Sequence, residues 1–339
     1  MSEVASVDAP PAQSGPPASA APDGEPVSAT PATPATPAAE SDAASTPPAD
    51  EEPDAVQVGP PLGAAVSTAS RAGRNLPAAI GVGVGLAALI VVTLFTSKLA
   101  FAAVIAGAVG VGIWELVRAI RPVEARPPMV PLIVGGVATI GMTWAGGTES
   151  LLLGLLLTVV AVLIWRLPDG PVGFQRDVTA AVLVAAYVPF LAGFAVLLEV
   201  EDDGVMRIVA FIATVVCSDV GGYAAGVLAG RHPMAPTVSP KKSWEGMAGS
   251  LIACAIAGAA FLELGFDNGA WWEGVVYGLA IAVAATLGDL TESMIKRDLG
   301  VKDMSSLLPG HGGLMDRLDS LLFAAPVAYL LLTAFAPAA

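Results

Sequence analysis

Long apolar stretches alternate with short polar connections from residue 76 to the end of the chain. A helix needs about 20 mainly apolar residues to cross the hydrocarbon core of a bilayer. Nine stretches approach or exceed that length, with expected bounds 76–97, 99–117, 128–146, 149–165, 178–198, 205–228, 247–265, 271–291 and 318–337. They lack the period-two alternation of membrane β-barrels. The pattern predicts an all-α integral membrane protein with about nine transmembrane helices.

The amino-acid composition supports a membrane location. Of the 339 residues, 55% are hydrophobic and only 14% are charged, and the mean hydropathy is +0.71. A soluble domain has roughly 25% charged residues. The surplus apolar surface has to face membrane lipids.

The N-terminal segment has a different composition. Residues 1–60 contain ten acidic residues and no lysine or arginine, in a background of Ala, Pro, Ser and Thr. Such a segment has too little apolar surface to offset the entropy lost on ordering. We therefore expect a disordered acidic tail at 1–75 and a membrane domain at 76–339. A purely solvated tail and a tail that docks another protein are both open.

Basic residues fall almost entirely on one side of the predicted spans. With nine spans, fourteen of the sixteen Lys and Arg residues share a side, and only Lys98 and Arg207 lie on the other. Cytoplasmic loops have an excess of Lys and Arg, so the N-terminus is predicted in the cytoplasm and the C-terminus outside. No signal peptide is expected at the N-terminus, and the cell membrane is the expected location.

Acidic residues lie inside two predicted spans. Asp219 lies in Cys-Ser-Asp-Val-Gly-Gly-Tyr, and an ionised carboxylate in the bilayer is costly enough to mark a functional site by default. Asp289 lies near the end of another span, and Ser293 and Lys296 follow at helical spacings of four and three. That helix face would offer a cation ligand and phosphate-binding groups. A paired structural Asp219 and a plain amphipathic helix end are the alternatives.

Three glycines surround a histidine just before the last predicted span, in Pro-Gly-His-Gly-Gly-Leu-Met-Asp-Arg-Leu-Asp at 309–319. Backbone amides of such a loop can bind an anion, particularly where a helix begins directly afterwards. Asp316 and Asp319 are three residues apart and would project from one helix face. Paired carboxylates beside phosphates suit Mg²⁺, whereas helix capping is the alternative for these two acids.

A compact basic segment lies in another predicted cytoplasmic loop. Lys241 and Lys242 stand between Ser239 and Ser243, and lysines bind phosphate as point charges. A basic pair beside the membrane could instead fix topology or contact anionic lipids. The catalytic part of the chain is therefore expected within 205–320.

The segment from Ser293 to Asp319, SMIKRDLGVKDMSSLLPGHGGLMDRLD, resembles the signature of the phosphatidate cytidylyltransferases, also called CDP-diacylglycerol synthases. Ser-Pro-Lys-Lys-Ser-Trp-Glu-Gly and Asp-Val-Gly-Gly-Tyr are similar to other segments of that family. Ser243 stands where the family commonly has threonine, and Ser305 where it often has glycine. The resemblance covers the C-terminal half strongly and the first five predicted spans only by hydropathy.

The resemblance implies transfer of the cytidylyl group from CTP to phosphatidate, with release of pyrophosphate and no covalent enzyme intermediate. Such a reaction depends on positioning, metal ions and cationic side chains. The implied ligands for Mg²⁺, and for a second cation, are Asp219, Asp289, Asp316 and Asp319. The implied catalytic residues are these four with Lys296, Arg297, His311 and Arg317. The implied substrate-binding residues are Ser239, Lys241, Lys242, Ser243, Ser293, Lys302, Gly310, Gly312 and Gly313.

The expected partners are CTP and phosphatidate from the bilayer, with no nucleic acid, and a homodimer is left open. Two other functions remain alternatives: a secondary transporter that uses Asp219 in the membrane, and another CTP-dependent lipid-modifying enzyme. Transporters tend to show paired halves with broken helices, and we find no internal repeat in the sequence.

Overall fold

The computed structural model describes residues 76–308 and 312–337. The predicted acidic tail at 1–75, and with it the expected disorder, lies outside the described residues. Gly310 and His311 lie outside them as well. The membrane domain is therefore described almost completely.

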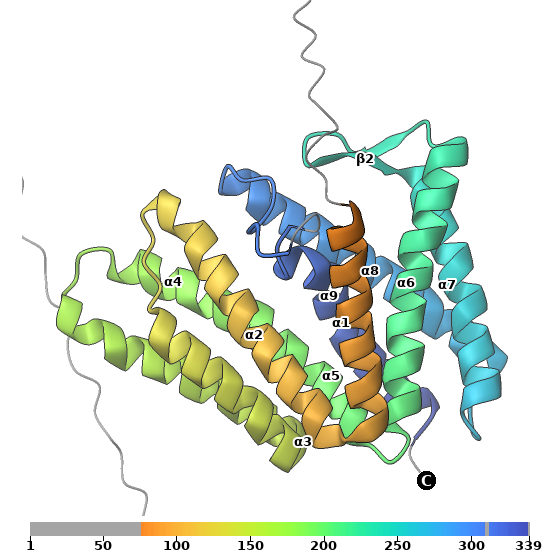
Figure 1. The fold of residues 1–339 in the computed structure, drawn as a ribbon, viewed down its shortest axis with the longest axis horizontal. Coiled ribbons are helices and arrows are strands. Elements are labelled where there is room, and N and C mark those ends of the chain that lie inside the picture. The colour runs from red at the N-terminus through yellow and green to blue at the C-terminus, as the bar shows by residue number, and fades with distance from the viewer. Residues whose placement is uncertain (1–75, 309–311, 338–339) are drawn as a thin grey trace, which may run out of the picture. The chain divides into compact units, whose positions relative to one another are not determined.

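The described part of the chain is mostly helical (Figure 1). Its helices are α1 (Leu76–Thr96), α2 (Lys98–Ile120), α3 (Met129–Arg166), α4 (Phe174–Ala185), α5 (Leu191–Val200), α6 (Gly204–Ala229), α7 (Trp244–Gly265), α8 (Trp271–Asp298) and α9 (Met315–Phe335). A π-helical turn, Ala186–Phe190, joins α4 to α5 without a break. Proline lacks the amide hydrogen that an α-helix needs, and Pro189 lies inside this turn.

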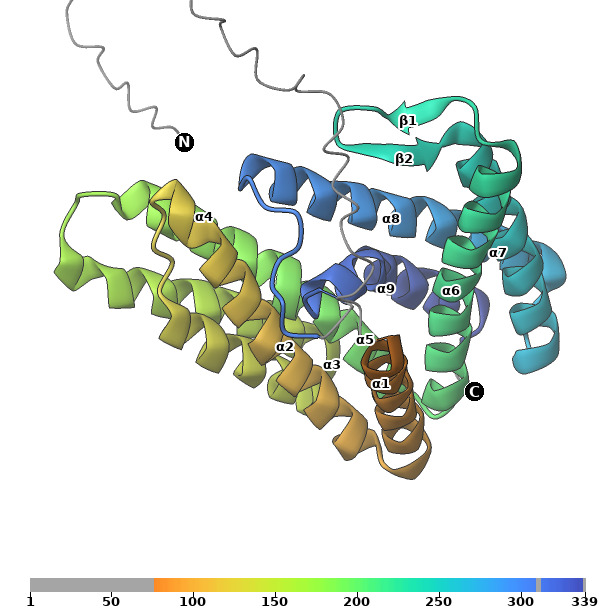
Figure 2. The same ribbon diagram turned by 45° about the horizontal axis from the view of Figure 1, so that its top comes forward.

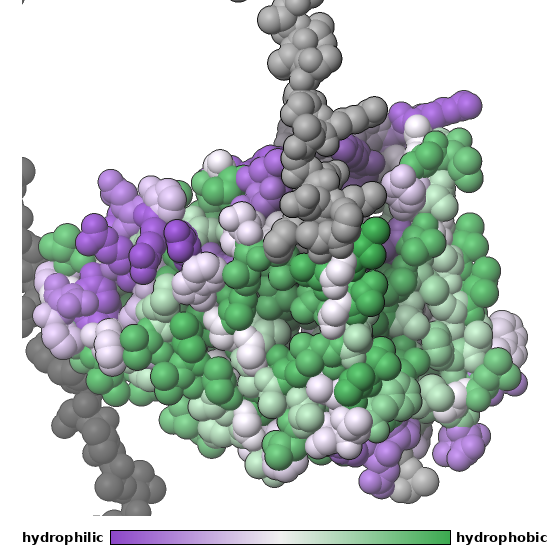
Figure 3. Space-filling model, in the orientation of Figure 1, coloured by the Kyte–Doolittle hydropathy of each residue, from purple (hydrophilic) through white to green (hydrophobic). Residues whose placement is uncertain are grey.

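Seven helical segments among the described residues are long and apolar enough to cross a membrane. The visible face of the molecule agrees with this, because a broad hydrophobic band separates hydrophilic residues at its upper and lower edges (Figure 3). The chain is thus a multi-pass membrane protein by length and composition. The seven segments include α3 as one and leave out α1, whose apolar part from Ile80 to Thr96 is shorter.

Helix α3 reverses direction at Gly147, where φ is 68° and ψ is −151°. Only glycine adopts this backbone conformation readily. The hydroxyls of Thr139 and Thr158, 19 residues apart in sequence, lie 3.4 Å from each other, although a straight helix would separate them by about 28 Å. The two halves of α3 pack closely because Gly135 and Gly154 face these threonines. The reversal falls between the spans predicted at 128–146 and 149–165.

A short hairpin lies between α6 and α7, so the all-α prediction is wrong in this detail. Strands β1 (Pro233–Ala235) and β2 (Ser239–Ser243) pair antiparallel at the ends of α6 and α7 (Figure 2). Glu245 fixes the base of the hairpin, because its carboxylate accepts hydrogen bonds from the amides of Arg231 and His232 and lies 2.5 Å from Nδ1 of His232. The two strands are joined by a turn that contains Pro236 and Thr237. They leave no periodic pattern of hydrophobic residues from which the sequence could have predicted them.

Glycines bring α6, α7 and α8 into backbone contact. A Cβ at Gly221 would lie 2.7 Å from the carbonyl oxygen of Gly249, and a Cβ at Gly258 or Gly278 would collide with the backbone of the facing helix. Helix α9 contributes to both hydrophobic clusters of the core, through Met315 and Leu322 on one side and through Ala325 and Leu332 on the other. Its first turn therefore lies where the N-terminal and C-terminal helices meet.

Candidate active site

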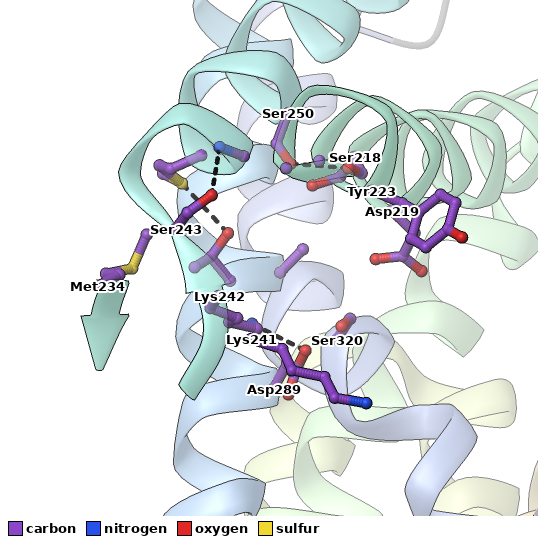
Figure 4. A pocket seen from close by; sticks show the side chains of 16 residues that line it. Ser218, Asp219, Tyr223, Met234, Lys241, Lys242, Ser243, Ser250, Asp289 and Ser320 are labelled. Carbon is purple, nitrogen blue, oxygen red and sulfur yellow. Dashed lines mark hydrogen bonds and ion pairs between the residues drawn. The ribbon is translucent and has the colours of Figure 1, made fainter. Parts of the chain in front are cut away.

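A polar cavity of about 280 Å³ lies beside the hairpin, between α6, α7, α8 and the start of α9 (Figure 4). Its polar lining includes Asp219 and Tyr223 of α6, Lys241 and Lys242 of β2, Asp289 of α8 and Ser320 of α9. Three segments that the sequence analysis selected separately thus share one cavity.

Lys242 and Asp289 form an ion pair in this cavity, with Nζ 2.8 Å from Oδ2. Their side chains are 23% and 36% exposed, so the pair is only partly shielded from water. The Ser293 hydroxyl, one turn further along α8, donates to Oδ1 of Asp289 at 3.3 Å, as the predicted four-residue spacing requires. Asp219 and Lys241 line the same cavity and are exposed. The cavity therefore combines carboxylate oxygens with ammonium groups that can bind phosphate.

The carboxylate oxygens of Asp316 are bonded to other groups of the protein. Its carboxylate accepts hydrogen bonds from Nζ of Lys296 at 2.9 Å, from the amide of Gly313 at 2.7 Å and from the amide of Met304 at 3.0 Å. The side chain is 7% exposed. These contacts are of the kind that the capping alternative for Asp316 requires, since they fix the loop that leads into α9.

Glu115 of α2, which the sequence analysis did not select, holds the same loop from the N-terminal half. It is fully buried, and its carboxylate accepts from the amides of Leu314 and Met315 at 2.9 and 2.8 Å and from the Ser305 hydroxyl at 2.5 Å. Leu314, the N-cap residue of α9, makes no side-chain cap of its own. Glu115 therefore caps α9 from a position 199 residues earlier in the chain.

The amides of Gly313, Leu314 and Met315 donate to these carboxylates, and Gly312 precedes them in a conformation that suits glycine. Its φ of 81° is in the left-handed region that favours glycine, and its carbonyl oxygen accepts from the amide of Leu308 at 2.8 Å. Gly310 and His311 lie outside the described residues. Their contact with phosphate stays a prediction.

Glu292 of α8 is a second acidic residue that the sequence analysis missed. It is fully buried, and its Oε2 lies 2.5 Å from Nζ of Lys296. Its Oε1 has no hydrogen-bond partner among the described residues. Lys296 thus bridges Glu292 and Asp316. A charged residue inside an otherwise apolar span is the signal that could have identified Glu115, whereas Glu292 lies one residue beyond the span predicted at 271–291.

The other predicted residues lie around the cavity and the loop. Nε of Arg297 donates to the carbonyl oxygen of Val238 at 3.3 Å and so ties α8 to the hairpin. The Ser243 hydroxyl accepts from the amide of Gly246 at 3.1 Å and caps α7. Three more have these places: Ser239 begins β2, Lys302 is exposed in the loop after α8, and Arg317 is exposed on the first turn of α9.

The described residues contain no group of three or more His, Cys, Asp or Glu side chains placed to hold a metal ion. Asp219 and Asp289 nevertheless line one cavity, and Asp319 follows one turn after Asp316 on α9. Magnesium is commonly bound by one or two carboxylates together with substrate phosphates. The oxygen donors of the cavity therefore fit a Mg²⁺ ion that a nucleotide helps to bind.

Residues 77–335 match the sequence profile described as the cytidylyltransferase family. The chain is 44% identical over 279 residues to the phosphatidate cytidylyltransferase of Mycobacterium leprae, which covers 78% of this chain and 89% of the relative. It is 41% identical over 277 residues to the phosphatidate cytidylyltransferase of Mycobacterium tuberculosis strain H37Rv, and the alignment covers 78% of this chain and 84% of the relative. It is 35% identical over 210 residues to the phosphatidate cytidylyltransferase of Helicobacter pylori strain 26695, and the alignment covers 57% of this chain and 78% of the relative. These relatives belong to the family that the motif at 293–319 resembles.

Proposed function

Because the chain belongs to the cytidylyltransferase family, we propose that it transfers the cytidylyl group of CTP to phosphatidate, giving CDP-diacylglycerol and pyrophosphate. The relatives that are 41–44% identical to it over 277–279 aligned residues are named for this activity. The structural observation that carries the proposal is the cavity where Asp219, Lys242 and Asp289 meet.

The chemistry needs charge neutralisation more than activation of a nucleophile. A phosphate oxygen of phosphatidate attacks the α-phosphorus of CTP, the bond to the β-phosphate breaks, and pyrophosphate leaves with the electron pair. That oxygen is already anionic, so no serine or cysteine has to be activated. Positioning of two polyanions and stabilisation of the leaving group supply the catalysis. We assign Lys241 and Lys242, on the hairpin, to the phosphates of CTP.

The metal assignment follows from which carboxylates are accessible. Asp219 and Asp289, which line the polar cavity, would hold Mg²⁺, and Asp319 on the first turns of α9 is assigned to a second cation. When bound, Mg²⁺ neutralises charge on the triphosphate and on the leaving pyrophosphate. Asp316 is assigned instead to positioning of the loop before α9, because Lys296 and two backbone amides occupy its oxygens.

The membrane arrangement is part of the same proposal. Counting the two halves of α3 separately and including α1 brings the membrane segments to the predicted nine. The distribution of Lys and Arg then supports a cytoplasmic N-terminus, an outer C-terminus and a cavity that opens to the cytoplasm, where CTP is present. The location would be the cell membrane.

The test is turnover by purified full-length protein in mixed micelles that contain phosphatidate and CTP. We expect a CMP-lipid and pyrophosphate in equal amounts, with loss of activity in EDTA. Release of CDP instead of pyrophosphate would identify a CTP-dependent kinase. Substrate accumulation in sealed vesicles without any CMP-lipid would favour the transporter. Full turnover in EDTA would contradict only the metal assignment.

A further inference from the structure

A purely apolar cavity of about 120 Å³, here called the apolar groove, lies between α1, α2, α5, α6 and α9. Every residue that lines it is Ala, Val, Leu, Ile or Phe. Its lining includes Leu318, Leu321, Leu322 and Ala325 from α9, and Phe101, Val104, Ile105 and Ala108 from α2. The groove is not used by the chemistry of the polar cavity.

The spacing of the lining residues shows that whole helix faces border the groove. On both α2 and α9 the positions recur at intervals of three, four and seven, which places them on one stripe of each helix. Such stripes normally close against each other in a helix bundle. Here a cavity remains beside α9, lined by its residues from Leu318 to Ala325, which span about 10 Å at the rise of an α-helix. The groove therefore follows the helix axis.

The first turns of α9 connect this groove to the polar cavity. Leu318 and Leu321 line the groove, whereas Ser320 lines the polar cavity. Val188 of the π-helical turn also lines the groove, and its neighbour Tyr187 packs edge-to-face on Phe323 of α9 with ring centroids 5.8 Å apart. Polar and hydrocarbon surfaces thus meet within one turn of helix.

We propose that the apolar groove binds a segment of one acyl chain of phosphatidate while the phosphate of that lipid lies at the polar cavity. This inference rests on the proposed function, which requires a substrate with a phosphate head and hydrocarbon chains. The volume equals that of about four water molecules in the liquid, and a methylene is close to water in size. Only a few methylenes of one chain fit, and the remainder stays in the bilayer.

In this proposal the groove orients the lipid substrate and adds little to its binding free energy. A chain that arrives from the bilayer gains little free energy from apolar contacts, because lipid tails are as apolar as leucine. Holding the chain instead restricts the direction from which the phosphate reaches the nucleotide, and correct orientation is a large part of catalysis for two bound reactants. Filling the groove should therefore impair long-chain substrates selectively.

The test compares turnover of dioleoyl and dihexanoyl phosphatidate by Ala108→Leu and Ala195→Leu, which add volume at two partly buried lining positions. We expect kcat/KM for the dioleoyl lipid to fall by about tenfold, the usual scale for a few atoms in an apolar pocket. The dihexanoyl lipid, whose shorter chains reach less far along the groove, should change less than about twofold, and the KM for CTP should be unchanged. Ala103→Leu, on the exposed side of α2, is the matched control and should behave as wild type.

Equal losses on both lipids, or no loss on either, would overturn the acyl-chain site while leaving the enzyme activity of the wild type intact. A wild type inactive on both lipids would instead overturn the proposed function and this inference with it. Photolabelling gives an independent readout. A phosphatidate with a diazirine in one chain should label Ile90, Ile212 or Phe101, and unlabelled phosphatidate should compete. Equal competition by phosphatidylcholine would show a site for bilayer lipid in general and would refute the assignment.

Discussion

The acidic side chains of the site differ in what surrounds their oxygens. Asp219 is exposed to the polar cavity, whereas Asp316 and Glu115 accept hydrogen bonds from backbone amides. A carboxylate that is open to a cavity can meet a substrate or cation. One that is saturated by amides holds backbone in place. The same residue type therefore has two roles here, and they are separable by mutation.

Asp219→Asn should lower turnover by about 10²–10³-fold, the usual effect of losing one electrostatic contact in an active site. Its thermal midpoint should stay at the wild-type value, because the side chain is exposed. Asp316→Asn should lower both quantities, since its amide group would face N–H donors that the carboxylate now satisfies. Turnover assays and thermal unfolding in detergent measure the two effects. Wild-type stability of Asp316→Asn would contradict its positioning role.

Glu115→Gln should destabilise the protein by about 2 kcal/mol or more, because buried hydrogen bonds to a charged group contribute about 1.5–3 kcal/mol each. Turnover should fall too, since the loop at 312–315 loses its anchor. Ser305→Ala is the control, as it removes one donor and leaves both amide contacts. We expect it to cost about 1 kcal/mol. A Gln variant as stable as the Ser305 control would show that the charge of Glu115 is unimportant.

At the level of helices, the close contact between α7 and α8 depends on glycines, which have no side chain to hold the two backbones apart. A Cβ at Gly278 would collide with the carbonyl of Cys254, so Gly278→Ala should destabilise the protein by about 1–3 kcal/mol, the usual range for overpacking. Gly141→Ala is the matched control in α3, where an added Cβ meets nothing within 4 Å. It should be neutral or slightly stabilising. Denaturant unfolding of both variants provides the comparison, and equal stability would argue against backbone contact between α7 and α8.

The helices were predictable from the sequence, whereas the contacts between them were not. Hydropathy predicted a span at 271–291, and α8 begins at Trp271 but continues to Asp298, because the amphipathic end is helical although it is not apolar. Polar motifs in the C-terminal half identified the residues of the cavity. The partners of Glu115 were inaccessible to such reasoning, since they lie about 200 residues away. The short strand pair at 233–243 has too few residues for a periodic signal.

For the whole molecule, the arrangement in the membrane predicts opposite accessibility of two loops. In a variant with Cys217 and Cys254 replaced by serine, Val172→Cys should react with an impermeant maleimide only from the cytoplasm. Asp202→Cys should react only from outside. Both native side chains are exposed, so failure to label should not arise from burial. Labelling of both positions from one side would contradict the nine-span arrangement.

The ion pair between Lys242 and Asp289 also makes two binding events interdependent. A phosphate that takes Lys242 leaves Asp289 without its counter-ion, and a cation that takes Asp289 frees Lys242. Each ligand thereby lowers the free energy needed to bind the other. Thermodynamic linkage requires this effect to be reciprocal. If nucleotide and metal bind at this ion pair as proposed, they should bind cooperatively, as one complex, rather than either of them alone.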